Sequence, residues 1–175
     1  MDDSYERMFK VDDESVMLNM FELASLQPFT ALANLYIRTL EGFMLVYSTT
    51  SRSSFEEVRI VQRKILAVKG KARCPMVLIG NHCTRATERE VDLVEGENLA
   101  REFGCRFVEI DHEKSINVTR AFEDLVRELR EHEKAESVTG LTMLSAENSP
   151  HSVKRQGWRQ ALAAFTSRWN LKRKA

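Results

Sequence analysis

Short apolar runs that alternate with helical segments constrain the fold of this chain more than any other feature. The runs are GFMLVY at 42–47, PMVLIG at 75–80 and CRFVEI at 105–110. Each is followed by a segment with apolar residues at helical spacing, over 53–70, 88–103 and 116–133. Strands that alternate with helices run parallel, with the helices as crossover connections. The pattern predicts an α/β doubly wound sheet whose crevice lies at the carboxyl ends of the strands.

The N-terminal third adds a hairpin and a short helix. Residues 5–11 and 15–21 alternate apolar with polar side chains around an acidic turn, which predicts two antiparallel strands. Pro28 can open a helix that ends near Arg38. For the helix that follows 42–47, the sequence predicts an N-cap at Ser53 or Ser54 and a C-terminus near Gly70.

Charge is balanced overall but unevenly placed. The chain has 26 basic and 26 acidic residues, yet residues 151–175 hold seven basic residues and no acid, so residues 1–150 carry a net charge of −7. With a formal net charge of zero, no global field favours nucleic acid as a partner, and none is expected. No signal peptide or membrane-spanning run is apparent in the sequence, and we expect a cytoplasmic protein. Three cysteines without C-x-x-C spacing predict free, buried or half-buried thiols and no metal site.

The C-terminal part predicts a separate unit. Residues 134–157 are mostly polar, with Gly140, Pro150 and Gly157, and favour a linker. Residues 158–175, the basic tail, carry apolar side chains that fall on one arc at helical spacing, which predicts an amphipathic basic helix. The apolar members are Trp158, Leu162, Phe165 and Trp169, with Arg159 and Arg168 on the flanks.

Several short sequence motifs are more specific to one protein family than the periodicity is. They are DSYERMF at 3–9, YIRTLEGFMLVYS at 36–48, SFEEV at 54–58, PMVLIGN at 75–81, EGENLAREFGCRFVEI at 95–110 and INVTRAFEDLVREL at 116–129. In their order and spacing, residues 2–132 resemble a Ras-type small GTPase. The resemblance implies a Ras-like three-layer sheet over 1–133. It also implies that GTP or GDP with Mg²⁺ is the family ligand, and that Asp3, Ser4 and Tyr5 begin the strand that meets effectors.

The motifs whose residues contact the phosphates in that family are missing or altered in this chain. No G-x-x-x-x-G-K-[ST] loop is present, and the match begins at the family's second strand, so the first strand and first helix are lacking. Where the family has D-T-A-G-Q-E, this chain has Glu22, Leu23, Ala24, Ser25, Leu26 and Gln27. Leu26 has no donor or acceptor to orient a water, and Ser25 lacks the freedom of glycine. We expect no ordinary hydrolysis.

The motifs whose residues contact the guanine base in that family are altered as well. The family's N-K-x-D reads Asn81, His82, Cys83 and Thr84, and its S-A-K reads Asp111, His112 and Glu113. Asn81, His82, Thr84, Asp111 and His112 are the weak candidates for nucleotide binding by resemblance. Thr84 cannot supply the paired carboxylate oxygens that accept from guanine, and Asp111 adds charge where a polyanion would bind. We therefore expect no cofactor on this chain.

Three functions remain open. The first is a Ras-like signalling protein that survives as a pseudo-GTPase scaffold for effectors or regulators. The second is a working GTPase, binding GTP or GDP with Mg²⁺, whose phosphate-loop segment is encoded upstream of Met1. The third is a membrane-surface adaptor that binds through the basic tail. The genomic sequence 5′ of Met1 would separate the first two.

Loss of the family's central first strand would leave two unpaired strand edges. Either the two halves close up, or another segment fills the slot, or the chain folds poorly. The sequence also leaves three alternatives for what the basic tail binds. It can dock on the acidic body, lie on an anionic membrane at the inner face of the plasma membrane, or bind a groove of a partner protein. No cysteine follows Cys105, so no prenylation box is expected.

If the basic tail binds an anionic membrane, its charge predicts salt-sensitive binding to vesicles that contain phosphatidylserine. Each Lys or Arg contributes up to ~1 kcal/mol at low salt, and the attraction weakens as the Debye length falls toward ~8 Å. Deletion of 154–175 should abolish binding, and alanine at Trp158 and Trp169 should weaken it. Vesicle co-sedimentation at two salt concentrations measures this. Equal binding by the full chain and the deletion would contradict the membrane hypothesis.

Overall fold

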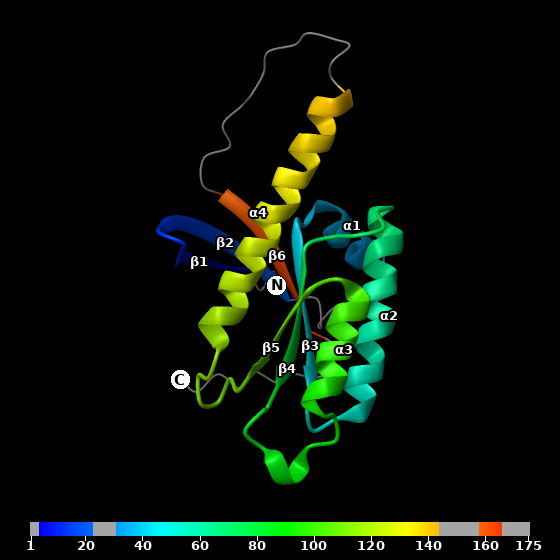
Figure 1. Cartoon of the computed structure of the whole chain (residues 1–175), viewed down its shortest axis with the longest axis vertical. Coiled ribbons are helices and arrows are strands. Elements are labelled where there is room, and N and C mark those ends of the chain that lie inside the picture. Colours follow the sequence, from blue (N-terminus) through cyan, green and yellow to red (C-terminus); the bar gives the residue numbers. More distant parts are fainter. Residues whose placement is uncertain (1–3, 23–30, 144–157, 166–175) are drawn as a thin grey trace.

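A computed structural model describes residues 4–22, 31–143 and 158–165, which form one six-stranded sheet (Figure 1). The spatial order is β1-β2-β6-β3-β4-β5. Only β1 and β2 pair antiparallel; every other described pair is parallel. The strands are β1 (Ser4–Val11), β2 (Glu14–Glu22), β3 (Gly42–Ser48), β4 (Met76–Asn81), β5 (Arg106–Ile110) and β6 (Trp158–Phe165). The predicted α/β fold is confirmed.

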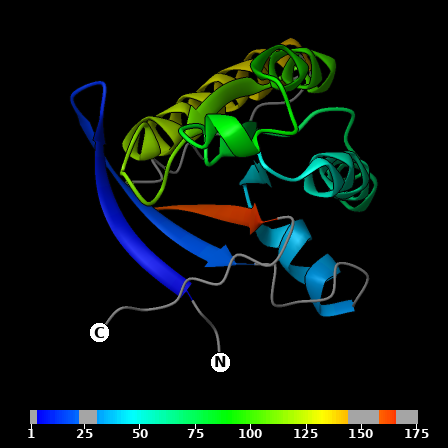
Figure 2. The same cartoon turned by 90° about the horizontal axis from the view of Figure 1, so that it is seen from below.

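Helices cover both faces of the sheet, which makes three layers (Figures 1 and 2). Alternation along β3 separates the two cores: Met44 and Val46 face the core under α4, whereas Phe43 and Leu45 face the core under α1, α2 and α3. β4 alternates in the same way. The helices are α1 (Ala31–Thr39), α2 (Arg52–Lys69), α3 (Leu93–Phe103) and α4 (Val118–Met143), with a 3₁₀ turn at Ala86–Glu88.

Local chemistry decides where the helices begin and end. α2 begins after Ser51, whose hydroxyl accepts from the Ser54 amide, so the predicted N-cap at Ser53 or Ser54 was wrong. The predicted end at Gly70 is confirmed, with φ at 62°. α3 begins five residues later than predicted, because Asp92 and Glu95 form a capping box. α4 continues through residues 134–143, which the sequence had assigned to the linker.

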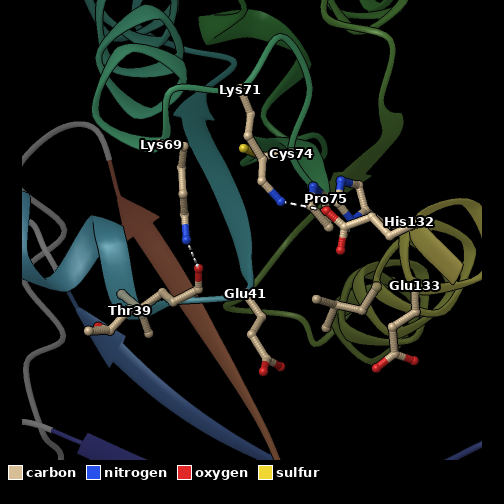
Figure 3. Close-up of a pocket in the computed structure, with 11 residues that line it drawn as sticks. Thr39, Glu41, Lys69, Lys71, Cys74, Pro75, His132 and Glu133 are labelled. Carbon is tan, nitrogen blue, oxygen red and sulfur yellow. Dashed lines mark hydrogen bonds and ion pairs between the residues drawn. The ribbon is translucent and has the colours of Figure 1, made fainter. Parts of the chain in front are cut away.

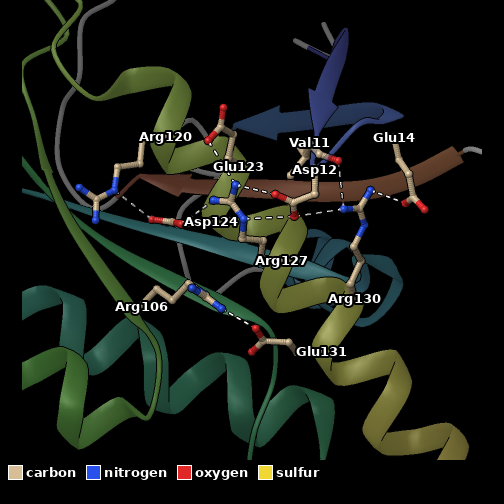
Figure 4. Close-up of polar contacts among 10 residues, drawn as sticks. All are labelled: Val11, Asp12, Glu14, Arg106, Arg120, Glu123, Asp124, Arg127, Arg130 and Glu131. Atoms are coloured by element: carbon tan, nitrogen blue, oxygen red, sulfur yellow. Dashed lines mark hydrogen bonds and ion pairs between the residues drawn. The ribbon is translucent and has the colours of Figure 1, made fainter.

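The β1–β2 hairpin is tied to α4 through its acidic turn (Figure 4). Arg127 donates to the two Asp12 carboxylate oxygens at 3.0 and 3.3 Å, and this bonding lowers the pKa of Asp12. Arg130 donates to the Val11 carbonyl at 3.2 Å and pairs with Glu14 at 2.7 Å. Each exposed pair stabilises little by itself. Together they fix the hairpin against a helix more than 100 residues away in sequence.

The predicted C-terminal helix is wrong for residues 158–165, which form strand β6. β6 lies between β2 and β3 and pairs with both in parallel. The physical reason is that two facing strand edges need hydrogen-bond partners, and this requirement overrides the helical spacing of the side chains. Of the three outcomes open from sequence, the structure shows the second: another segment fills the slot. Trp169 and Arg168 lie outside the described residues.

Strand β6 also joins the predicted tail to the sheet, so residues 158–165 are not a separate unit. Deletion of 154–175 would remove a central strand, and the vesicle test is better made by neutralising Arg168, Lys172, Arg173 and Lys174. Cys74 is buried and Cys83 and Cys105 are half-buried free thiols, as predicted. Among the described helices, none has a stretch apolar and long enough to cross a bilayer.

Gly96 of α3 lies where the helix comes closest to the sheet. A β-carbon there would stand 2.4 Å from the Phe107 ring and 2.4 Å from the hydroxyl of Tyr47, which is fully buried. We expect Gly96→Ala to lower the free energy of unfolding by about 1–3 kcal/mol, because overpacking outweighs the ~1 kcal/mol gained in helix propensity. Urea denaturation measures this. Glu97→Ala, on the exposed face of the same helix, is the control, and equal or higher stability of Gly96→Ala would contradict the close approach.

Candidate functional site at the carboxyl edge of the sheet

The parallel strands all end at one edge of the sheet. Their last residues are Glu22 of β2, Phe165 of β6, Ser48 of β3, Asn81 of β4 and Ile110 of β5. This edge is where a doubly wound sheet binds its ligands. The candidate residues in the loops after β4 and β5 meet here, and we call these two segments, 81–85 and 111–117, the base-side loops.

Thr84 and Asp111 connect the base-side loops. The Thr84 hydroxyl donates to Oδ2 of Asp111, and the Lys114 amide donates to Oδ1 at 3.2 Å. Lys114 Nζ lies 2.8 Å from the Thr84 hydroxyl oxygen. Asp111 is buried, and these hydrogen bonds, that of Thr84 above all, lower its pKa. Both carboxylate oxygens of Asp111 therefore bind groups of the protein itself.

Asn81 and His112 make a second connection. The Asn81 side chain is buried, its Oδ1 accepts from the His112 amide at 3.3 Å, and its Nδ2 lies 3.0 Å from His112 Nδ1. The ring of His112 meets the ring of His82 edge to face, with centroids 5.1 Å apart. The polar atoms of Asn81 thus face the neighbouring loop.

The backbone around His82 is also held. His82 has φ at 66°, in the left-handed region, and its carbonyl accepts from Thr49 at the end of β3 at 3.0 Å. Burial, with the charges of Arg85 and His112, lowers the pKa of His82, while Glu113 and Asp111 oppose this shift. The imidazole is therefore held toward its neutral form.

Two salt bridges hold the base-side loops in place, one formed beside them by Arg89 and Glu109 and one formed between them by Arg85 and Glu113. Arg89 donates to both Glu109 oxygens at 2.7 and 2.9 Å and to the Cys83 carbonyl at 3.2 Å. Arg85 donates to Glu113 at 2.8 Å. A forked Arg–carboxylate pair fixes geometry as well as charge. The base-side loops are therefore ordered by contacts within the protein.

The sequence prediction missed Thr49, Arg85 and Lys114 as parts of this site. Opposite charge was the available signal for Arg85, since Arg85 lies in one loop and Glu113 in the other, whereas Lys114 shares its loop with Asp111 and Glu113. Thr49 gave no signal, because its role depends on the proximity of β3 and β4 in the sheet.

The remaining candidates lie elsewhere or outside the described residues. Glu22 ends β2, and Ser4 and Tyr5 begin the edge strand β1. Trp158, Arg159, Leu162 and Phe165 are in β6. Asp3, Ala24, Ser25 and Leu26 lie outside the description. Among the described residues, no three or more His, Cys, Asp or Glu side chains gather to form a metal site.

A cavity of about 310 Å³ lies at the opposite end of the strands, between the α1–β3 turn and α4 (Figure 3). Lys69 reaches across it and donates to the carbonyls of Arg38 and Leu40 at 2.9 and 2.5 Å, and burial lowers the pKa of Lys69. The ammonium group satisfies carbonyls at the end of α1, which is a structural role. This cavity is distinct from the predicted site.

The family model described as Ras family matches residues 1–131. The chain is 46% identical over 134 residues to a Ras-like protein of Laccaria bicolor, an alignment that covers 77% of this chain and 64% of that protein. This chain thus spans a little under two thirds of the length of that relative.

We expect His82→Asn to reduce the loss of stability that follows acidification. A His with a lowered pKa in the folded protein takes up its proton more readily when unfolded, so its contribution is present above the unfolded pKa of about 6.5 and lost as the pH falls below it. Asparagine tolerates the left-handed backbone and does not titrate. Urea midpoints at pH 7.5 and 5.5 measure the difference. An equal drop for both proteins would contradict the assigned shift.

Proposed function

Because this chain belongs to the Ras family of small GTPases, we propose that it serves Ras-type signalling as an interaction scaffold. In this proposal it neither binds nor hydrolyses GTP in the manner of the family's switches. The observation that carries the proposal is the bonding between the base-side loops. Groups that would face a guanine base are turned toward each other instead.

The base-side chemistry argues for this in detail. Position 84, a carboxylate in the family's motif, is a threonine whose hydroxyl donates to Asp111. The carboxylate near this position belongs to Asp111 of the other loop. The Thr84 hydroxyl and the Lys114 amide each donate to one of its two oxygens. Breaking two hydrogen bonds to a buried carboxylate to free it for a base costs about 1.5–3 kcal/mol each. The described residues at this edge therefore do not fit guanine as the family binds it.

The altered switch motif at residues 22–27 supports the same proposal. Leu26, at the position of the family's catalytic glutamine, has no group that can orient a water molecule. Ser25, at the position of the switch glycine, restricts the backbone. Both changes would slow hydrolysis even where a nucleotide bound.

The outer edge of β1, one of the two edges of the described sheet, is a surface available to partners. β1 pairs with β2 on one side and ends the described sheet on the other, so its outer backbone groups can receive a partner strand. Met8 is 63% exposed, and Glu6, Arg7 and Lys10 are exposed beside it. The contacts of Asp12 with α4 hold this edge without any contribution from a nucleotide.

We expect no binding of GTP or GDP with Mg²⁺ to the 175-residue chain at concentrations up to about 100 µM. Isothermal titration calorimetry measures this, with an intact Ras-family GTPase as the positive control. A dissociation constant at or below micromolar, ~ −8 kcal/mol, would overturn the proposal and favour the alternative of a GTP-binding switch.

A second readout tests the scaffold itself. A Ras-effector domain should bind the chain with the same affinity in the presence and absence of GTP. Met8→Glu, on the exposed edge of β1, should weaken that binding, whereas Ile60→Glu on exposed α2 should not. A nucleotide-dependent affinity would contradict the scaffold proposal.

A further inference from the structure

In the sheet, β2 and β3 are separated by the width of one strand, and β6 occupies the slot between them. Neighbouring strands stand ~4.8 Å apart, so β2 and β3, with one strand between them, lie roughly 10 Å apart. At that separation their backbones cannot bond to each other, and both facing edges would be unpaired without β6. A slot with hydrogen-bonding groups on both sides is a site for an extended chain.

The pairing register shows how β6 occupies this slot. Residues 158–163 pair with Met17–Glu22 of β2, and residues 161–165 pair with Gly42–Val46 of β3. The three residues 161–163 are therefore paired on both sides. Within β6 this doubly paired segment has the most backbone pairing, and each hydrogen bond contributes about 0.5–1.5 kcal/mol net.

The sequence of the segment suits a central strand. Residues 161–165 read ALAAF, an uninterrupted apolar run like those of β3 and β4, and they contain no proline or glycine. The 14 residues from 144 to 157 can span up to about 50 Å, so the end of α4 at Met143 need not lie close to the start of β6.

We propose that the gap between β2 and β3 is a strand-acceptor site and that Trp158–Phe165 is its intramolecular ligand. Donation of this strand pairs both facing edges and completes the described sheet. Because recognition is through backbone bonds and an apolar run, the site also binds the same segment as a separate peptide. This inference does not depend on the proposed function, since it concerns β2, β3 and β6 and not the base-side loops.

The first test is Ala163→Pro in the full chain. Ala163 pairs with Glu22 on one side and Met44 on the other, and proline removes an amide donor from a central strand. We expect a lower melting temperature and a loss of amide protection in 17–22 and 42–46 by hydrogen exchange. Ala146→Pro, in the connection before β6, is the matched control. Unchanged melting and protection in Ala163→Pro would overturn the proposal.

The second test keeps the proposal falsifiable if Ala163→Pro fails to fold. A labelled peptide of residues 156–167 should bind the Ala163→Pro chain at least tenfold more tightly than the wild-type chain, whose slot is occupied, and should restore amide protection. The same peptide with proline at the position of Ala163 should do neither. Absence of binding and rescue by the native peptide would overturn the acceptor site. A wild-type dimer that Ala163→Pro converts to monomer would overturn the intramolecular assignment, because the strand would then come from a second copy.

Discussion

Backbone hydrogen bonding across the centre of the sheet is the constraint on which the rest of this structure depends. β2 and β3 each present one edge to the slot, and β6 satisfies both. The hairpin of β1 and β2 joins the other strands of the sheet through β6 alone in the described pairing. Both helical layers rest on the sheet so formed, so the cores under α4 and under α1, α2 and α3 depend on that central pairing.

The carboxyl edge illustrates how a scaffold can be kept while its chemistry changes. The strands still deliver Asn81 and Asp111 to adjacent loops, as the family's order requires. What differs is the direction of their hydrogen bonds, which run between the loops. Buried polar groups need partners, and groups that are satisfied within the protein have less to offer a ligand. In the proposed scaffold, local substitutions close this edge to guanine without disturbing the sheet beneath it.

Contacts distant in sequence also shape the surface. The turn at Asp12 is fixed by Arg127 and Arg130, although the hairpin and α4 are separated by most of the chain. This contact holds the turn at the end of the edge strand β1 against α4 (Figure 4). In the proposed scaffold, pairing with β2 and this contact with α4 together hold β1 in place.

Sequence by itself determined the elements whose local signals agree. Apolar runs gave β3 and β4, alternation gave the hairpin, and Gly70 gave the end of α2, because each signal acts within a few residues. The family and the candidate residues of the base-side loops were also predictable from short sequence motifs. Only the tertiary structure decided the state of 158–165, whose helical spacing yielded to two unpaired edges. It alone paired Thr84 with Asp111, because hydrogen bonds between loops depend on which strands lie side by side.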